Sequence, residues 1–181
     1  MPLVKTIKLK YKKNIDRIAG MDMMPSLINE AEQNKIKIFF YGTTPDILEK
    51  IVDKARKENP GIQIAGSFSP PFKKLSTKEK QEHIDLINQS GAGMVFVALG
   101  CPKQEKWMAE NSNKINAVLL GVGGAFPVYV NMQKRAPAWI RNLSLEWLYR
   151  LAQDPKRLYK RYFYTNTKFL FLFAKQFLLK P

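Results

Sequence analysis

The sequence predicts an α/β fold, in which a Rossmann-like, mostly parallel sheet is followed by a basic, helical C-terminal appendage. Short apolar runs alternate with amphipathic helical patterns between residues 36 and 130. Strands that alternate with helices pair in parallel through right-handed crossovers. After residue 130 the sequence becomes rich in basic and aromatic residues. We therefore expect two domains, a Rossmann-like core over residues 1–130 and an appendage over residues 131–181.

Four strands are expected from short apolar runs. These runs cover residues 36–41, 62–65, 94–99 and 117–122. Such runs are typical of strands that are buried on both faces of a parallel sheet. The two adjacent prolines of residues 69–72 predict a rigid loop after the second strand, because proline cannot donate to a ladder.

The helices between these strands carry recognisable start signals. The first begins at Thr44 and has Pro45 at its first position, where the missing N–H of proline costs nothing. The second begins at Ser76 or Thr77, and Glu79 stands three residues after Ser76, as in a capping box. A third helix is expected to begin after the third strand.

The composition is that of a folded protein with a strong positive charge. The 181 residues include 45% hydrophobic residues and carry a formal net charge of +15. The single cysteine, Cys101, excludes an intramolecular disulfide and fits a reducing compartment. No apolar stretch reaches the roughly 18 residues of a membrane span, and residues 1–13 lack the apolar core of a signal peptide.

The positive charge is concentrated at the two ends of the chain. Residues 1–20 have a balance of +5, residues 21–130 of +1, and residues 131–181 of +9. A near-neutral middle between two basic ends marks a change of composition near residue 131. A field of this sign suggests a polyanionic partner, such as a nucleic acid, an anionic membrane or a phosphorylated substrate.

Three glycine-containing loops follow predicted strands, at residues 42–44, 100–102 and 121–124. Ligands of parallel α/β sheets bind beyond the carboxyl ends of the strands, and helix N-termini there offer N–H groups to phosphate. Together the loops predict a nucleotide or phosphate pocket, although each loop alone could be an ordinary turn. The last loop lacks the third glycine and the following helix–strand context of a dinucleotide fingerprint.

Residues 100–107 are the most specific segment. Pro102 opens a helix that is expected to run to about residue 110. Lys103 can meet a phosphate, Gln104 can exchange hydrogen bonds with a sugar, and Trp107 is expected to face the sheet. The alternative interpretation is a polar helix start with a core tryptophan.

Metal chemistry has no support in the sequence. One histidine and one cysteine cannot build a zinc site, and no Asp-x-Asp pair is present to hold a nucleotide-bound Mg²⁺. His83 lies in a polar helical stretch and is predicted to be a surface residue. Cys101 could be a nucleophile, but a small residue that fills a tight turn is the favoured interpretation.

Residues 97–108, VALGCPKQEKWM, resemble the signature of the TagA/WecG/CpsF glycosyltransferases, glycosyltransferase family 26. The resemblance continues along nearly the whole chain. It includes residues 16–22, 40–42, 60–61, 69–72, 121–126, 135–137, 145–151 and 155–158.

The resemblance implies transfer of an N-acetylmannosamine-like sugar from a UDP-sugar to a polyprenyl-diphosphate-linked acceptor. Such reactions build teichoic acid and other cell-surface polysaccharides of bacteria. The family reaction is inverting and needs no metal or other cofactor. By resemblance, Arg17 and Gln104 are the catalytic candidates in the sugar-nucleotide site. The substrate-binding candidates are Gly42, Thr43, Gly100, Pro102, Lys103, Glu105, Gly123 and Phe126.

Two departures from the family pattern stand out. In the family, an Asp-Gly pair leads into a segment resembling residues 1–4, and its aspartate is the proposed general base. The resemblance thus implies that the general base is missing upstream of Met1. We therefore expect an N-terminal truncation or a misplaced start, and at most residual activity from this chain alone. The family also has aspartate where Pro127 stands and glycine where Asn131 stands.

The appendage is predicted to contact an anionic membrane. Its aromatic and apolar side chains would enter the headgroup region while its cations meet anionic lipid. The alternative is a helical cap on the core with a basic outer face. The expected location is the cytoplasm, peripheral on the inner face of the membrane. The candidates for membrane or acceptor binding are Arg135, Arg150, Arg157 and Arg161.

Two other functions stay open at this point. A non-catalytic sugar-nucleotide binder would keep the donor site without turnover. A nucleic-acid-binding module would use the basic, aromatic tail, but no recognisable nucleic-acid motif supports it, so no nucleic-acid partner is expected. A homo-oligomer is left open.

Overall fold

The computed structural model describes residues 19–73, 75–143 and 145–178. These residues fall into two compact units, residues 19–134 and residues 135–178. The predicted division of functions between a nucleotide-binding core and a membrane-associating appendage stays a prediction.

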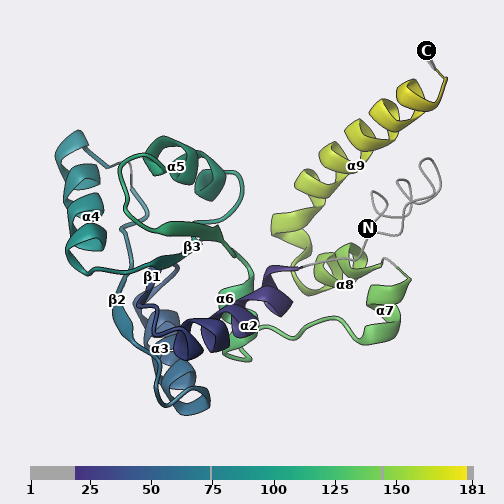
Figure 1. The fold of residues 1–181 in the computed structure, drawn as a ribbon. Coiled ribbons are helices and arrows are strands. Elements are labelled where there is room, and N and C mark those ends of the chain that lie inside the picture. Colours follow the sequence, from purple (N-terminus) through teal and green to yellow (C-terminus); the bar gives the residue numbers. More distant parts are fainter. Residues whose placement is uncertain (1–18, 74, 144, 179–181) are drawn as a thin grey trace. The chain divides into compact units, whose positions relative to one another are not determined.

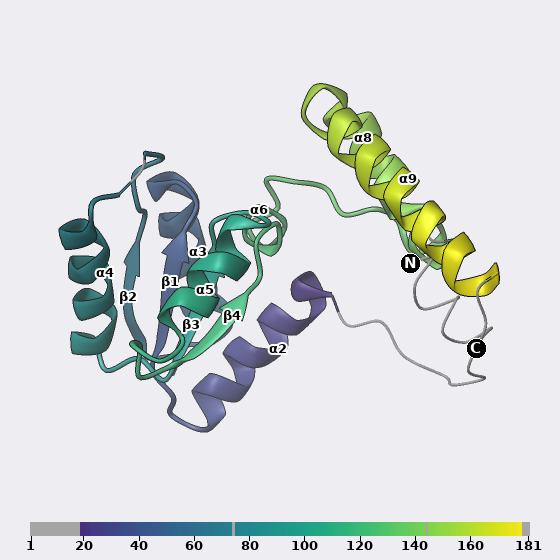
Figure 2. The same ribbon diagram turned by 90° about the horizontal axis from the view of Figure 1, so that it is seen from above.

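The first unit is built on a four-stranded sheet with the order β2-β1-β3-β4, and every neighbouring pair is parallel. The strands are β1 (Ile38–Gly42), β2 (Ile64–Phe68), β3 (Met94–Ala98) and β4 (Val118–Gly121). Gly42 of β1 is level with Ala98 of β3, so these two central strands end together. The predicted parallel α/β class is confirmed, and Figure 2 shows the strands side by side.

Helices cover both faces of the sheet. The three predicted connecting helices are present as α3 (Pro45–Glu58), α4 (Thr77–Gln89) and α5 (Lys103–Asn111). Two further helices, α2 (Gly20–Gln33) and α6 (Ala125–Tyr129), were not predicted. Figure 1 shows α4 and α5 on one face of the sheet, and α2, α3 and α6 on the other.

The core has one cluster of buried side chains on each face. The side chains of β1 alternate between them, as the two-residue period of a strand requires. Phe40 stacks on Phe96 at 5.6 Å between ring centroids, on the face covered by α2, α3 and α6. Phe39 and Tyr41 belong to the opposite cluster, beneath α4 and α5.

The start signals predicted for the helices are confirmed. Thr44 is the N-cap of α3, with Pro45 in the first turn. Of the two candidates for α4, Ser76 is the N-cap, and it forms the reciprocal capping box with Glu79. The contact with Lys73 and the bonds from Ser76 hold the pKa of the Glu79 carboxyl at about 2.

The second unit is helical, which confirms the helical C-terminal part. It contains α7 (Ala138–Asn142), α8 (Glu146–Gln153) and α9 (Pro155–Leu178). Within the unit α8 packs against α9, and the rings of Trp147 and Tyr162 meet edge to face at 6.2 Å. Across the described residues, no helix has both the length and the apolar character needed to cross a membrane.

Candidate functional site

The sheet has a topological switch between β1 and β3. The chain leaves β1 through α3 toward β2 on one side, and it leaves β3 through α5 toward β4 on the other. Two adjacent strands whose connections diverge leave a crevice at their carboxyl ends, which is where open α/β sheets bind ligands. The 42–44 and 100–102 loops both start at this crevice.

The backbone after β1 is held close to the end of β3. Gly42 has a φ of +115°, and a Cβ there would lie 2.4 Å from the carbonyl oxygen of Ala98. Thr43 also has a positive φ, +55°, and its N–H donates to the same oxygen at 3.0 Å. A β-branched residue rarely adopts this conformation, and such strain concentrates at ligand sites. The predicted role of Gly42 and Thr43 in substrate binding stays a prediction.

Gln104 presents a buried oxygen that has no hydrogen-bond partner among the described residues. Its side chain is 7% exposed in the first turn of α5, and its Nε2 donates to Glu105 Oε1 at 3.0 Å. The unpaired Oε1 faces the loop after β4, where a Cβ added at Gly123 would lie 2.9 Å from it. A buried acceptor without a partner is costly, so a bound ligand that donates to it would gain free energy.

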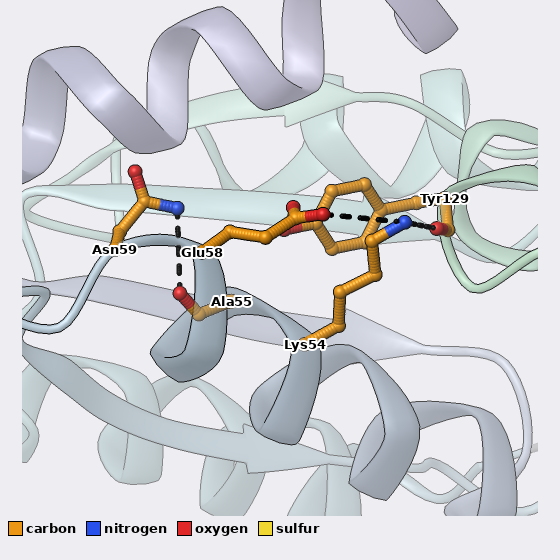
Figure 3. Close-up of polar contacts among 5 residues, drawn as sticks. All are labelled: Lys54, Ala55, Glu58, Asn59 and Tyr129. Atoms are coloured by element: carbon orange, nitrogen blue, oxygen red, sulfur yellow. Dashed lines mark hydrogen bonds and ion pairs between the residues drawn. The ribbon is translucent and has the colours of Figure 1, made fainter.

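A cluster of polar contacts holds α6, the helix that follows the 121–124 loop, in place (Figure 3). Lys54 Nζ on α3 donates to the Tyr129 carbonyl oxygen at 2.6 Å, and Tyr129 Oη donates to Glu58 Oε2 at 2.9 Å. Lys54 and Glu58 also pair at 3.5 Å. Burial, together with the bond to Glu58, raises the pKa of the Tyr129 phenol. Because these contacts tie α6 to α3, they limit movement of the loop between β4 and α6.

The prediction that His83 is a surface residue is wrong. His83 is 8% exposed, and its Nδ1 lies 2.8 Å from Tyr41 Oη. Burial lowers the pKa of the His83 imidazole, although Glu79 and Glu82 act in the opposite direction. The Tyr41 ring also stacks on Trp107 at 4.6 Å, which confirms that Trp107 faces the sheet. The stack supports the inner wall of the switch crevice.

The structure brings together only part of the predicted site. Gly42 and Thr43 lie at the end of β1, while Gln104 approaches Gly123 across the end of β4. The side chain of Phe126 is fully buried against Phe40, so it can act on a ligand only by shaping the backbone. Gly100, Pro102, Lys103 and Glu105 are exposed around the start of α5.

Two predictions concern the start of the chain, which lies outside the described residues. One is the catalytic candidate Arg17. The other is the role that the family resemblance implies for the segment around Met1. Because the described residues begin at residue 19, neither prediction is tested by the structure, and both stay predictions.

The arginines predicted for membrane or acceptor binding belong to the second unit. Arg135 is partly exposed, and Arg150 pairs with Glu146 at 2.9 Å within that unit. The side chains of Arg157 and Arg161 lie outside the described part of the structure. Their predicted role in binding therefore stays a prediction.

Three further observations concern residue chemistry and the third loop. Cys101 is exposed in the turn before α5 rather than packed into it.

Within residues 19–73, 75–143 and 145–178, no group of three or more His, Cys, Asp or Glu side chains could hold a metal ion. The loop after β4 does continue into a helix, α6, contrary to the expectation that helical context is missing there.

Sequence reasoning missed the supporting contacts of the site. Tyr41 and His83 are 42 residues apart, and Glu58 and Tyr129 are 71 apart. Each side chain belongs to an ordinary strand or helix pattern, and no local signal pairs them. Only the periodicity of α4, with His83 beside the buried Ile84 and one turn before Ile87, could have placed the histidine on the inner face.

The fold defines a parallel α/β protein with a topological switch at the carboxyl ends of β1 and β3. The profile described as "Glycosyl transferase WecG/TagA/CpsF family" matches residues 1–181. The chain belongs to this family, and the resemblance found in the sequence is confirmed.

Two relatives carry the name "N-acetylglucosaminyldiphosphoundecaprenol N-acetyl-beta-D-mannosaminyltransferase". The protein from Bacillus spizizenii (strain ATCC 23059 / NRRL B-14472 / W23) is 38% identical over 156 residues, which cover 86% of this chain and 59% of the relative. The protein from Bacillus subtilis (strain 168) is 39% identical over 142 residues, which cover 78% of this chain and 54% of the relative. The chain thus spans less than two thirds of the length of these relatives.

Proposed function

We propose that this chain acts in the transfer of an N-acetylmannosamine-like sugar from a UDP-sugar to a polyprenyl-diphosphate-linked acceptor. The names of the two relatives support the transferred sugar and a diphosphate-linked N-acetylglucosaminyl acceptor. The donor follows from the family resemblance and from the switch crevice, which is a usual place for nucleotides in α/β sheets. The product would enter cell-surface polysaccharide or teichoic acid synthesis.

The unpaired Oε1 of Gln104 is the observation that carries this proposal. It is buried beside a glycine loop, and an acceptor in that position suits a sugar hydroxyl or amide N–H. Gly42, Thr43 and Gly123 would let the nucleotide approach the backbone closely. Gly100, Pro102 and Glu105 would shape the start of α5 around the sugar, and Lys103 would face the diphosphate.

The proposed reaction is a single displacement with inversion and without a metal. The acceptor hydroxyl oxygen forms the new bond to the anomeric carbon, the bond to the UDP oxygen breaks, and UDP leaves with the bonding electron pair. A general base takes the hydroxyl proton, and the family resemblance implies an aspartate in that role. Arg17 would stabilise the charge on the departing diphosphate.

The second unit is proposed to hold the protein on the inner face of the cytoplasmic membrane. Along α9, Phe163 is 76% exposed and Phe171 is 68% exposed, and Lys168 and Lys175 are exposed between and after them. Exposed aromatic side chains next to cations suit an interface with anionic lipid. Arg135, Arg150, Arg157 and Arg161 would contribute to lipid or acceptor binding.

A radiolabel transfer assay tests the proposal directly. The substrates are UDP-N-acetylmannosamine and a lipid-diphosphate-linked N-acetylglucosamine, with and without EDTA. Any transfer by this chain, residual or full, should be unchanged by EDTA, should give a product of inverted anomeric configuration, and should be lost in Gln104→Ala. Gln89→Ala, which removes the same side chain from an exposed position on α4, is the matched control.

The alternative of a non-catalytic sugar-nucleotide binder gives a different result. In that case UDP raises the melting temperature of the chain while transfer stays undetectable at all enzyme concentrations. If UDP neither stabilises the chain nor supports transfer, the proposed donor site is wrong.

A further inference from the structure

The two ends of the Gln104 side-chain amide have different surroundings. Its Nε2 donates to Glu105 Oε1 at 3.0 Å, whereas its own Oε1 is buried with no hydrogen-bond partner among the described residues. The amide lies between two glycines of the 121–124 loop. A Cβ added at Gly121 would lie 3.1 Å from Nε2, and one added at Gly123 would lie 2.9 Å from Oε1. Within the described part of the chain, only the nitrogen of this amide has a protein partner.

The shape of the amide does not decide which of its ends faces Glu105. The oxygen and the nitrogen of a glutamine amide are nearly the same size, and a half-turn about the last side-chain bond exchanges them. Either orientation of Gln104 therefore fits the space beside Gly121 and Gly123. The choice between the two orientations depends on the hydrogen-bonding chemistry of the neighbouring groups.

Glu105 supplies the chemistry that decides the orientation. A carboxylate accepts hydrogen bonds and cannot donate them, so it attracts the amide nitrogen and repels the amide oxygen. After a half-turn, the Gln104 oxygen would stand where Nε2 now lies, 3.0 Å from an oxygen of Glu105. Glu105 makes no ion pair with another described residue, so no cation among them competes for its carboxylate.

We propose that Glu105 is a positioning residue, which turns the Gln104 amide so that Oε1, and not Nε2, faces the ligand. The site then favours a ligand group that donates a hydrogen bond and disfavours a group that can only accept one. The inference rests on the proposed contact between Gln104 and the donor sugar. It gives Glu105 an indirect role, because this exposed carboxylate acts on the ligand through its neighbour.

Replacing the carboxylate with a donor should turn the amide around. The ammonium of Glu105→Lys can only donate, so it should attract Oε1 and leave Nε2 toward the ligand. The affinity for UDP-N-acetylmannosamine, measured by calorimetry, should fall about tenfold or more, because an amide donor then meets the donor of the sugar. The affinity for UDP, which lacks the sugar, should not fall. Added positive charge alone would tighten the binding of both anionic ligands, so a loss confined to the sugar nucleotide identifies the amide.

Two further variants calibrate this result. Glu105→Gln both donates and accepts, so it permits both orientations of the amide and should weaken binding of the sugar nucleotide only about twofold. Glu49→Lys makes the same change of charge as Glu105→Lys at another exposed glutamate, on α3, and should leave the ratio of the two affinities within about twofold. Both glutamates are exposed, and melting temperatures check that the variants keep the fold.

The Gln104→Ala background separates an indirect role of Glu105 from a direct contact. If Glu105 acts through the amide, Glu105→Lys no longer weakens binding of UDP-N-acetylmannosamine there, because no amide is left to turn. A further loss in that background would show that Glu105 contacts the ligand itself, and it would overturn the proposal. Equal affinities of the native chain and Glu105→Lys for UDP-N-acetylmannosamine would also overturn it.

Proton NMR of the side-chain amides tests the orientation without a ligand, so it separates this inference from the proposed function. The Nε2 protons of Gln104 are identified by their absence in Gln104→Ala. One of them should be shifted downfield by the carboxylate and protected from exchange with water, and this pattern should disappear in Glu105→Lys but persist in Glu49→Lys. If the chain shows this pattern and binds no UDP-sugar, the proposed function fails while the orienting role of Glu105 stands. Identical Gln104 signals in the native chain and in Glu105→Lys would overturn the proposal, whatever the chain binds.

Discussion

The Oε1 atom of Gln104 lies close to Gly123. A Cβ atom added at Gly123 would lie only 2.9 Å from that oxygen, which is closer than van der Waals contact allows. Gly123 also has a φ of +43°, which L-residues rarely adopt. The glycine therefore has two roles, one in the backbone turn and one in keeping the space around the buried amide open.

Gly123→Ala is expected to weaken binding of the UDP-sugar about tenfold, as for the loss of one buried hydrogen bond of about 1.5 kcal/mol between Gln104 and the sugar. It should also destabilise the fold by about 1–2 kcal/mol, because alanine is forced into the left-handed region. Gly91→Ala separates the two effects: Gly91 has a φ of +68°, but only Lys37 Nζ lies within 4 Å of its added Cβ. Equal affinity of the two variants for the UDP-sugar would contradict a role for the Gln104 contact.

The pair of Tyr41 and His83 predicts an unusual histidine titration. Burial lowers the pKa of His83 below its ordinary value of 6.5. As the pH falls from 6.5 toward the folded pKa, the folded state therefore binds fewer protons than the unfolded state. The contribution of the neutral, buried His83 ring to the free energy of unfolding is present above pH 6.5 and is lost as the pH falls toward and through the folded pKa. Because the chain has one histidine, ring proton NMR reports this titration without ambiguity.

The melting temperature should therefore fall as the pH drops below about 6.5 in the native chain, and should fall less in His83→Gln. Tyr41→Phe removes the hydroxyl partner of His83 and should cost about 1 kcal/mol at neutral pH. A His83 midpoint at or above 6.5 would show that the ring is not desolvated as its 8% exposure indicates.

The sheet and its three connecting helices could be predicted because their signals are local. The apolar runs, the proline after Thr44 and the Ser76–Glu79 capping box each lie within a few neighbouring residues. The helix α2 was missed for the same reason. Pro25 stands inside it, and its stability comes from burying Met24, Ile28 and Ala31 against the core rather than from local preference.

The candidate site was only partly predictable because its chemistry depends on distant contacts. Gln104 was chosen from the sequence as a residue that could exchange hydrogen bonds, but its unpaired oxygen arises only when the end of β4 folds against the start of α5. His83 looked exposed because charged residues surround it in sequence, although its ring faces the sheet.

The contact between Tyr129 and Glu58 predicts how strongly α6 is held. Tyr129→Phe keeps the ring beneath Lys54 Nζ, which lies 4.7 Å from its centroid, and removes only the bond to Glu58. We expect a loss of about 1 kcal/mol, seen as a fall in melting temperature of about 2–4 °C. Tyr159→Phe, at an exposed tyrosine of α9, should leave the melting temperature unchanged.

A double-mutant cycle isolates the pair. Tyr129→Phe and Glu58→Gln combined should cost less than the sum of the single changes, because both remove the same hydrogen bond. Strict additivity would mean that the 2.9 Å contact contributes nothing in solution.

The exposed aromatic side chains of α9 predict binding to anionic vesicles. Phe163 and Phe171 are largely exposed, so replacing both with serine removes apolar surface without leaving a cavity. Phe163→Ser/Phe171→Ser should lower partitioning onto phosphatidylglycerol vesicles about tenfold or more, while the melting temperature stays within about 1 °C. Co-sedimentation with the vesicles measures both the affinity and its dependence on salt.

The matched control is Phe72→Ser, because Phe72 is 85% exposed but belongs to the first unit. If α9 carries the interaction, this change leaves vesicle binding intact, whereas Lys168→Glu/Lys175→Glu weakens it most at low salt, where anionic headgroups are least screened. Equal binding of the native chain to neutral and anionic vesicles would remove the electrostatic part of the argument. Equal losses in Phe72→Ser and the α9 variant would remove the specific role of α9, since any exposed aromatic would then serve as well.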